Sequence, residues 1–187
     1  EIELKKINSV NIKQTEVKTK NLSETFEIFE SIKHEAYSVA WIDCLAKKKN
    51  IGRSKVIFGD FLDDGNFSKK DKRKITVPFE FPTFFLNRFS VKVFNWIYYN
   101  MQLSKEKKKV VDYDTFFFPL DKILNWNKIY GKNGFTQYQF ILPKKHSFNG
   151  LKEILELISE SGKGSFLAVL KLYGKSNKNW LSFPIKG

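Results

Sequence analysis

The feature that most constrains the fold is a strand–helix–strand order of hydrophobic patterns, which occurs twice along the chain. In each case a stretch typical of a strand precedes a helix-like stretch, in which apolar residues lie three and four positions apart, and a second strand-like stretch follows. The first set covers residues 10–17, 23–33 and 37–42, and the second covers residues 135–142, 147–161 and 165–173. We therefore predict an α+β fold: a mostly antiparallel sheet with helices packed on one face and two strand–helix–strand units.

Local signals support the helix boundaries. Asn21 or Ser23 can cap the first helix, and Gly162 can end the later one. Between the two units we predict strands at residues 53–61 and 110–117 and a helix at residues 90–102. The segment between the first of these strands and that helix, residues 78–86, is apolar but holds two prolines, which argues against a central strand. Core packing, a lid and a membrane-proximal surface are all open interpretations of this segment.

Composition limits the classes of function. The 187 residues suffice for one domain with a core, and the net charge of +13 would attract polyanions of any kind. The single cysteine, Cys44, lies in an apolar run and is predicted to be a buried structural thiol. His34 and His146 lack the spacing of a zinc site, so no metal is expected. The sequence contains no Walker loop, GxGxxG, paired-carboxylate motif or nucleophile–base pair, so no catalytic or cofactor-binding residue is assigned.

Polar residues inside apolar strands are the candidate site. Because side chains alternate along a strand, Gln137 and Gln139 share one face, and Val169, Lys171 and Tyr173 share another. Amides and an ammonium group beside aromatic rings suit a polyhydroxylated ligand. An ordinary solvent-facing sheet surface would show the same pattern, and both interpretations remain open from the pattern alone.

Several segments, in order, resemble one family, that of decaprenylphosphoryl-β-D-ribose 2'-oxidases among the vanillyl-alcohol-oxidase type of FAD enzymes. The resemblance spans nearly the whole chain apart from the basic loop and the apolar stretch after it. The segments that carry it are residues 37–43 (YSVAWID), 52–53 (GR), 118–121 (FPLD), 126–128 (WNK), 130–131 (YG), 134–140 (GFTQYQF), 165–174 (SFLAVLKLYG) and 181–184 (LSFP).

The resemblance implies that residues 1–187 are a single substrate-binding domain from a larger FAD-dependent oxidoreductase, with the flavin-binding domain outside this sequence. The implied reaction oxidises a hydroxyl of a sugar, or of a polyprenyl-phosphate sugar, to a ketone by hydride transfer to flavin. The family's base-like residues would also lie outside the sequence. These 187 residues alone are therefore expected to bind no flavin and to be inactive.

Carried over position by position, the resemblance implies a substrate pocket lined by Trp41, Phe117, Leu120, Lys128, Gln137, Gln139, Val169, Lys171 and Tyr173. Gln139 and Lys171 would anchor sugar hydroxyls or phosphate, and Trp41 and Tyr173 would form walls. Two positions depart from the family. Phe117 and Phe118 replace a more polar Tyr-His pair, and Lys128 stands where arginine is usual and cannot form the same bidentate fork to phosphate.

The expected partners are the sugar or lipid-linked sugar substrate, the flavin domain of the same chain and a short-chain reductase. We expect a cytoplasmic protein, with peripheral membrane contact through the apolar segment at residues 78–86 as a further hypothesis. The alternative function is a basic nucleic-acid-binding module without catalytic activity, in which the lysine clusters contact phosphates. That alternative lacks a compact recognition motif in the sequence.

Overall fold

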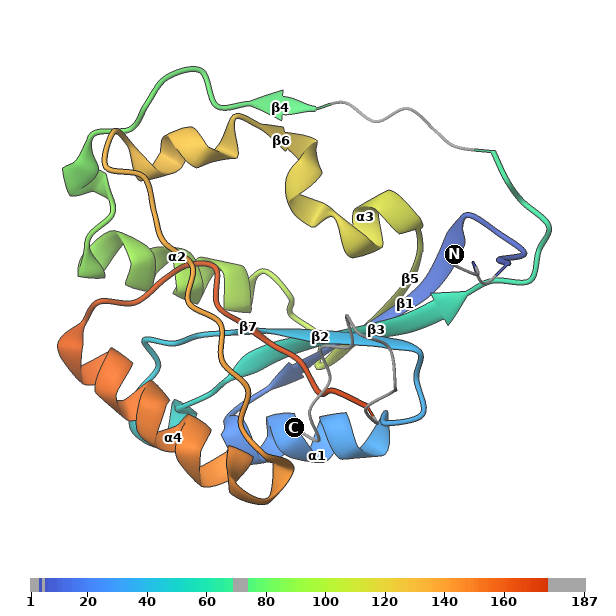
Figure 1. Cartoon of the computed structure of the whole chain (residues 1–187), viewed down its shortest axis with the longest axis horizontal. Helices are drawn as coiled ribbons and strands as arrows, with labels where there is room; N and C mark the ends of the chain where they lie inside the picture. Colours follow the sequence, from blue (N-terminus) through green and yellow to red (C-terminus); the bar gives the residue numbers. More distant parts are fainter. Residues whose placement is uncertain (1–3, 5, 69–73, 175–187) are drawn as a thin grey trace.

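A five-stranded antiparallel sheet forms the centre of the protein (Figure 1). The structure, a computed structural model, describes residues 4, 6–68 and 74–174. The strand order is β5-β1-β3-β2-β7, and β4 and β6 form a separate parallel pair. The strands are β1 (Asn11–Thr19), β2 (Tyr37–Ile42), β3 (Ser54–Phe61), β4 (Ile75–Thr76), β5 (Glu106–Asp112), β6 (Ile123–Leu124) and β7 (Val169–Leu170). The predicted α+β class with an antiparallel sheet is thus confirmed.

Four α-helices and four short 3-10 helices connect these strands within the described residues. The α-helices are α1 (Leu22–Ser31), α2 (Arg88–Asn100), α3 (Tyr113–Phe117) and α4 (Lys144–Ser161). The 3-10 helices are η1 (Lys48–Asn50), η2 (Thr83–Phe85), η3 (Pro119–Lys122) and η4 (Trp126–Tyr130). None of these helices is both long and apolar enough to cross a membrane.

The first strand–helix–strand unit is present as predicted. The Asn21 side chain caps α1 by accepting a hydrogen bond from the Glu24 amide at 3.0 Å. Strand β3 then lies between β1 and β2 and is antiparallel to both. The turn before β3 requires a glycine, because Gly52 has φ +72° and a Cβ there would lie 2.6 Å from the Cβ of Leu22.

Helices cover the sheet on both faces. Helices α1 and α4, which belong to the two predicted units, lie on the face that carries Ala40 and Val56, below the sheet in Figure 1. Helices α2 and α3 lie above it. On that side the ring of Tyr98 in α2 packs 4.7 Å from Trp41, measured between ring centroids. The helices of the two units therefore share one face, while the connection between the units covers the other.

The second unit differs from the prediction. Helix α4 is present and ends at Gly162, which has φ +72°, but residues 135–142 form no strand and only Val169–Leu170 of the predicted strand 165–173 pairs with β2. A strand requires a hydrogen-bonded neighbour as well as an alternating sequence. Among the described residues, no strand lies beside residues 135–142.

The predicted strand at residues 110–117 was also wrong in its second half. Strand β5 ends at Asp112, whose carboxylate accepts hydrogen bonds from the amide and hydroxyl of Thr115, both through Oδ1 and at 2.9 and 3.1 Å. This contact caps α3. The proline-containing segment 78–86 forms the short helix η2 and no strand, as predicted.

Candidate functional site

A large hollow lies on the β7 side of the sheet, where most of the second unit forms no strand among the described residues. It has a volume of about 1170 Å³ and is lined by α1, α4 and the extended segments 135–142 and 164–173. Its lining includes Phe26, Leu151 and Leu155, whose side chains give it an apolar floor. A hollow of this size and character can hold a ligand with a substantial apolar part.

Five of the nine predicted site residues line this hollow: Gln137, Gln139, Val169, Lys171 and Tyr173. The side chains of Gln137, Gln139 and Lys171 form no hydrogen bond or ion pair with any other described residue. Amide and ammonium groups without protein partners can donate hydrogen bonds to a ligand. The structure thus brings the two glutamines and the lysine together around one apolar cavity.

Trp41 does not line the hollow. It pairs with Val169 across β2 and β7, so the two residues share a sheet face, as the alternation predicts. Its ring is buried against Tyr98, and its Nε1–H donates a hydrogen bond to the carbonyl of Phe166 at 2.8 Å. Trp41 was expected to form a wall of the pocket. Instead, it holds the start of the segment that carries Val169 and Lys171.

The three remaining predicted residues lie in the connection between the two units, which runs above the sheet in Figure 1. Phe117, in α3, packs against Tyr37 at the far end of β2, with ring centroids 4.9 Å apart. Leu120 is in η3, and Lys128 is in η4, where its carbonyl accepts a hydrogen bond from the amide of Phe81 at 2.9 Å. None of the three lines the hollow.

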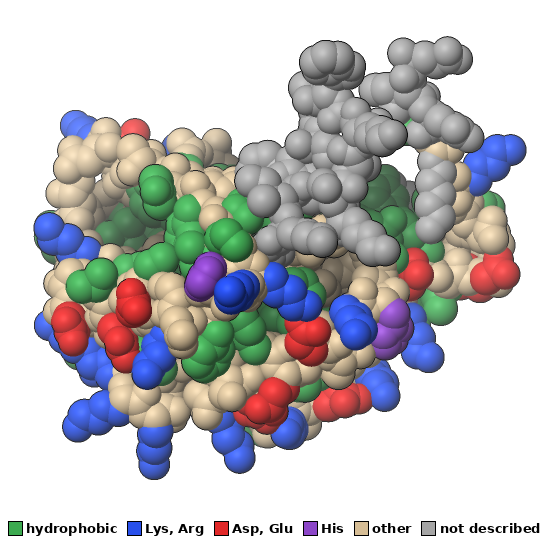
Figure 2. All heavy atoms as spheres, turned by 60° about the horizontal axis from the view of Figure 1, so that its bottom comes forward, with side chains coloured by type: hydrophobic (Ala, Val, Ile, Leu, Met, Phe, Trp, Pro, Cys, Tyr) green, Lys and Arg blue, Asp and Glu red, His purple; other side chains and the backbone are tan. Residues whose placement is uncertain are grey.

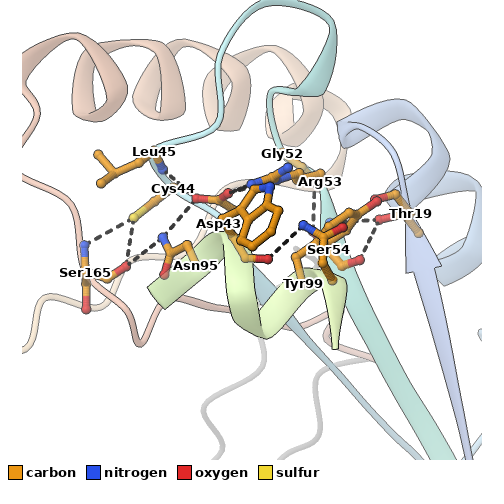
Figure 3. Close-up of polar contacts among 12 residues, drawn as sticks. Thr19, Asp43, Cys44, Leu45, Gly52, Arg53, Ser54, Asn95, Tyr99 and Ser165 are labelled. Atoms are coloured by element: carbon orange, nitrogen blue, oxygen red, sulfur yellow. Dashed lines mark hydrogen bonds and ion pairs between the residues drawn. The ribbon is translucent and has the colours of Figure 1, made fainter. Parts of the chain in front are cut away.

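A polar network beside the hollow holds the segment that begins at Ser165 (Figure 3). The carboxylate of Asp43 accepts hydrogen bonds from Arg53 at 2.7 and 2.9 Å, from the Asn95 amide group at 2.9 Å and from the backbone N–H of Leu45 at 3.1 Å. Asn95 is fully buried and also approaches the Ser165 carbonyl at 3.5 Å. The network links β2, β3 and α2 to the lining of the hollow.

Cys44 also hydrogen-bonds to Ser165. Its thiol donates to the Ser165 carbonyl and accepts from the Ser165 amide, both at 3.2 Å. Burial raises the pKa of the Cys44 thiol, so the neutral, hydrogen-bonding form is favoured. The predicted role of Cys44 as a buried structural thiol is confirmed.

Sequence reasoning missed an aromatic stack that connects the two lining segments. The Tyr130 ring packs on Phe135 at 4.3 Å and on Phe166 at 5.3 Å, both in stacked geometry. Phe166 in turn contacts Phe94 of α2 at 5.4 Å. Alternation along a strand could not reveal this stack, because its members come from η4, α2 and two separate loops. A buried carboxylate such as Asp43 was more readily foreseeable, since a charge in an apolar run requires a partner.

The surface around α1 and α4 carries charges of both signs (Figure 2). At the rim of the hollow, Lys144 pairs with Glu30. No cluster of three or more His, Cys, Asp or Glu side chains suited to a metal ion occurs in the described ranges. The arrangement can therefore bind and orient an amphipathic, hydroxylated ligand, and we assign no acid, base or nucleophile to it.

No family model matches the chain, but a comparison with curated proteins finds relatives. Over 181 residues the chain is 36% identical to decaprenylphosphoryl-β-D-ribose oxidase of Mycolicibacterium smegmatis. The match covers 90% of this chain but only 39% of the relative. The resemblance seen in the sequence is thus confirmed, and the chain corresponds to well under half of that oxidase.

Proposed function

We propose that the chain is the substrate-binding domain of an FAD-linked oxidoreductase acting on a sugar or a polyprenyl-phosphate sugar. The observation that carries the proposal is the hollow lined by Gln137, Gln139 and Lys171, in a chain 36% identical to an oxidase whose name specifies such a substrate. The proposed reaction of the whole protein converts a sugar hydroxyl to a ketone, with flavin as the hydride acceptor.

None of the described α-helices begins with the glycine-rich turn that could hold a flavin dinucleotide. Such cofactors are commonly held by a glycine-rich turn at a helix N-terminus. Here α1 begins after Asn21, α2 after Asn87, α3 after Asp112 and α4 after Pro143, and none of these caps is glycine. The proposal therefore assigns FAD to the part of the protein that corresponds to the remaining 61% of the relative (100 − 39).

Binding and orientation are the roles proposed for this chain. The amides of Gln137 and Gln139 can donate to and accept from sugar hydroxyls, and the ammonium group of Lys171 can donate to a hydroxyl or a phosphate oxygen. The apolar floor formed by α1 and α4 suits a prenyl chain. Holding the sugar in one orientation lowers the entropic part of the barrier to oxidation.

The test uses the full-length protein and follows flavin reduction with a short-chain prenylphosphoryl ribose. We expect a yellow protein that binds FAD. Lys171→Ala should raise KM by about 10-fold to 100-fold, the effect of losing a hydrogen bond that involves a charged group. Gln139→Ala should raise KM by about 2-fold to 10-fold, the effect of losing a hydrogen bond between neutral groups. Lys145→Ala is the matched control, because Lys145 lies in α4 but does not line the hollow. A full-length protein that takes up no flavin would refute the oxidoreductase proposal.

The nucleic-acid alternative has less support. In the basic cluster of residues 105–109, Lys105 pairs with Glu24 at 2.7 Å and Lys108 pairs with Glu106 at 2.8 Å. Two of its lysines are thus already matched by carboxylates. The test measures oligonucleotide binding and its salt dependence for the wild type and for the Lys107→Glu/Lys109→Glu double variant. If both proteins bind the oligonucleotide equally well, this cluster does not contact the nucleic acid.

The proposal also includes a reductase partner. The carbonyl carbon of a keto sugar can accept a hydride. We therefore expect the product to be consumed by an enzyme that reduces the ketone. We propose a short-chain reductase in this role. Pull-down of the full-length protein with such a reductase, in the presence and absence of the sugar, would test it.

A further inference from the structure

Helix α2 has apolar side chains on two opposite sides. The inner side packs on the sheet through Val91, and it also buries Asn95. The outer side exposes Phe89, Trp96 and Met101, which are 76%, 59% and 73% solvent-accessible. A helix at the surface of a soluble domain normally presents polar residues outward. The outer side of α2 is therefore an apolar surface that no other described element covers.

The apolar surface continues beyond the helix. Phe84 and Phe85 in η2 are exposed, and Leu103 just after α2 is almost fully exposed. Helix η2 is tied to the start of α2, because Ser90 Oγ donates to the Phe85 carbonyl and the Asn87 amide group donates to the Phe84 carbonyl at 2.9 Å. We call the combined surface the α2 outer face; it comprises Phe84, Phe85, Phe89, Val93, Trp96, Ile97, Met101 and Leu103.

Positive charge surrounds the α2 outer face. Residues 74–109 contain seven basic residues and two acidic ones, Glu80 and Glu106, a net charge of +5. Two of the seven, Lys105 and Lys108, are paired with Glu24 and Glu106. The basic residues include Arg88 and Lys92 on α2 itself, and neither forms an ion pair with a described residue. Exposed aromatic side chains next to lysine and arginine are typical of helices that lie in the interface of an anionic membrane.

We propose that the α2 outer face inserts into the headgroup region of a bilayer that contains anionic lipid. The net positive charge of the surrounding chain favours anionic lipid over a second copy, because two copies that meet at this face would bring like charges together. The apolar side chains would enter the boundary between headgroups and acyl chains, and the surrounding cations would contact lipid phosphates. This inference goes beyond the proposed function and does not depend on sugar oxidation.

Residues 78–86 add further aromatic rings beside η2 and α2. Phe79 and Phe81 pack on each other, with centroids 5.4 Å apart, and Phe81 packs on Phe85 at 5.6 Å. Phe79, Phe84 and Phe85 remain exposed to solvent. The segment therefore contributes rings to the same surface as α2, which favours the membrane-proximal interpretation over core packing.

The test measures flotation of the full-length protein with vesicles of phosphatidylcholine alone and with vesicles in which about a quarter of the lipid is phosphatidylglycerol. We expect binding to the anionic vesicles and a blue shift of Trp fluorescence on binding. Phe89→Glu and Trp96→Glu should each lower the partition coefficient about tenfold or more, since each removes a large apolar side chain. High salt should weaken binding of the wild type.

Leu157→Glu is the matched control. Leu157 is an exposed apolar residue on α4, on the opposite side of the sheet, and its substitution changes the charge by the same amount. It should bind vesicles like the wild type, and circular dichroism should show all three variants folded. The proposal is overturned if the wild type ignores anionic vesicles or if Leu157→Glu reduces binding equally. It is also overturned if the Phe89 and Trp96 variants change only the oligomeric state in sedimentation velocity.

Discussion

Strand β3, which follows the first unit, and the segment 135–142, which begins the second, differ in how their backbones are paired. Strand β3 pairs with β1 from Ser54 to Phe61 and with β2 from Ser54 to Gly59. Segment 135–142 is extended and pairs with no strand in the part of the chain that the structure describes. We call strands β1, β2 and β3 the first region, and the two lining segments, residues 135–142 and 165–173, the second region. The first region satisfies its polar groups internally, whereas the second leaves the side chains of Gln137, Gln139 and Lys171 available to a ligand.

This difference suggests that one region stabilises the fold and the other binds the ligand. Buried pairs and ladders give the first region high local stability, while exposed segments with few internal hydrogen bonds belong to the low-stability end of a fold. Binding residues are often placed on such segments and supported by a rigid scaffold. We therefore expect substitutions in the first region to affect folding and substitutions in the second to affect binding.

The largest effect is expected at the buried ion pair of the first region. Lys55 Nζ lies 2.6 Å from Glu16 Oε1, and both residues are buried beneath α2. Lys55→Met would leave a buried carboxylate without its partner, which costs about 3–5 kcal/mol. Urea unfolding would measure the loss. The double variant Glu16→Gln/Lys55→Met should recover most of the lost free energy of unfolding. If Lys55→Met alone lowers the free energy of unfolding by less than about 1 kcal/mol, the pair behaves like an exposed salt bridge and the account is contradicted.

A smaller effect is expected at Asp43, which connects the two regions. Asp43→Asn removes the charge that accepts from Arg53 and Asn95 and should cost about 2–3 kcal/mol. Because Asn95 and Cys44 contact Ser165, amide exchange near residue 165 should also accelerate. Asp63→Asn, at an exposed carboxylate, is the control and should change stability by less than about 0.5 kcal/mol. Equal costs at the two positions would contradict the role of the network.

Substitutions in the second region should scarcely change stability. Gln139 and Lys171 are exposed and have no partner among the described residues, so Gln139→Ala and Lys171→Ala should each alter the free energy of unfolding by less than about 0.5 kcal/mol. The same variants are those expected to weaken substrate binding. If either one destabilises the protein as much as Asp43→Asn does, the two regions are not distinct in the way proposed.

The smallest effect concerns pH and Cys44. Burial raises the pKa of its thiol, so the unfolded chain ionises first as pH rises. The contribution of the thiol to stability is therefore present at neutral pH and is lost as pH rises through the ordinary thiol range into the raised folded value. The difference in unfolding free energy between wild type and Cys44→Ala should shrink from about pH 7 to about pH 10. A difference that grows with pH would contradict burial of the thiol.

The sequence predicted elements whose determinants are local. Helices α1, α2 and α4 follow from apolar spacing, with Asn21 and Gly162 marking ends that the structure confirms. Strands β1, β2 and β3 follow from their apolar and alternating residues. The class of fold was predictable because these elements already define two units.

The errors arose where tertiary partners decide the outcome. Residues 135–142 alternate like a strand, but a ladder also requires a neighbour that the sequence does not identify. The buried position of Trp41 depends on Tyr98 in α2, which is far away in the chain. Five predicted site residues line one hollow, but alternation does not explain this, because residues of the opposite set, such as Tyr138 and Leu170, line it as well. Phe117, Leu120 and Lys128 lie in short helices whose placement no periodicity predicts.

Hydrogen–deuterium exchange of the full-length protein, with and without a short-chain prenylphosphoryl ribose, tests the central claim most directly. We expect the ligand to slow exchange in residues 135–142 and 165–173 and to leave β1 and β3 unchanged, because no residue of β1 or β3 lines the hollow. Lys171→Ala should abolish this protection at the same ligand concentration. Protection confined to β1 and β3, or none in residues 135–142, would contradict the account.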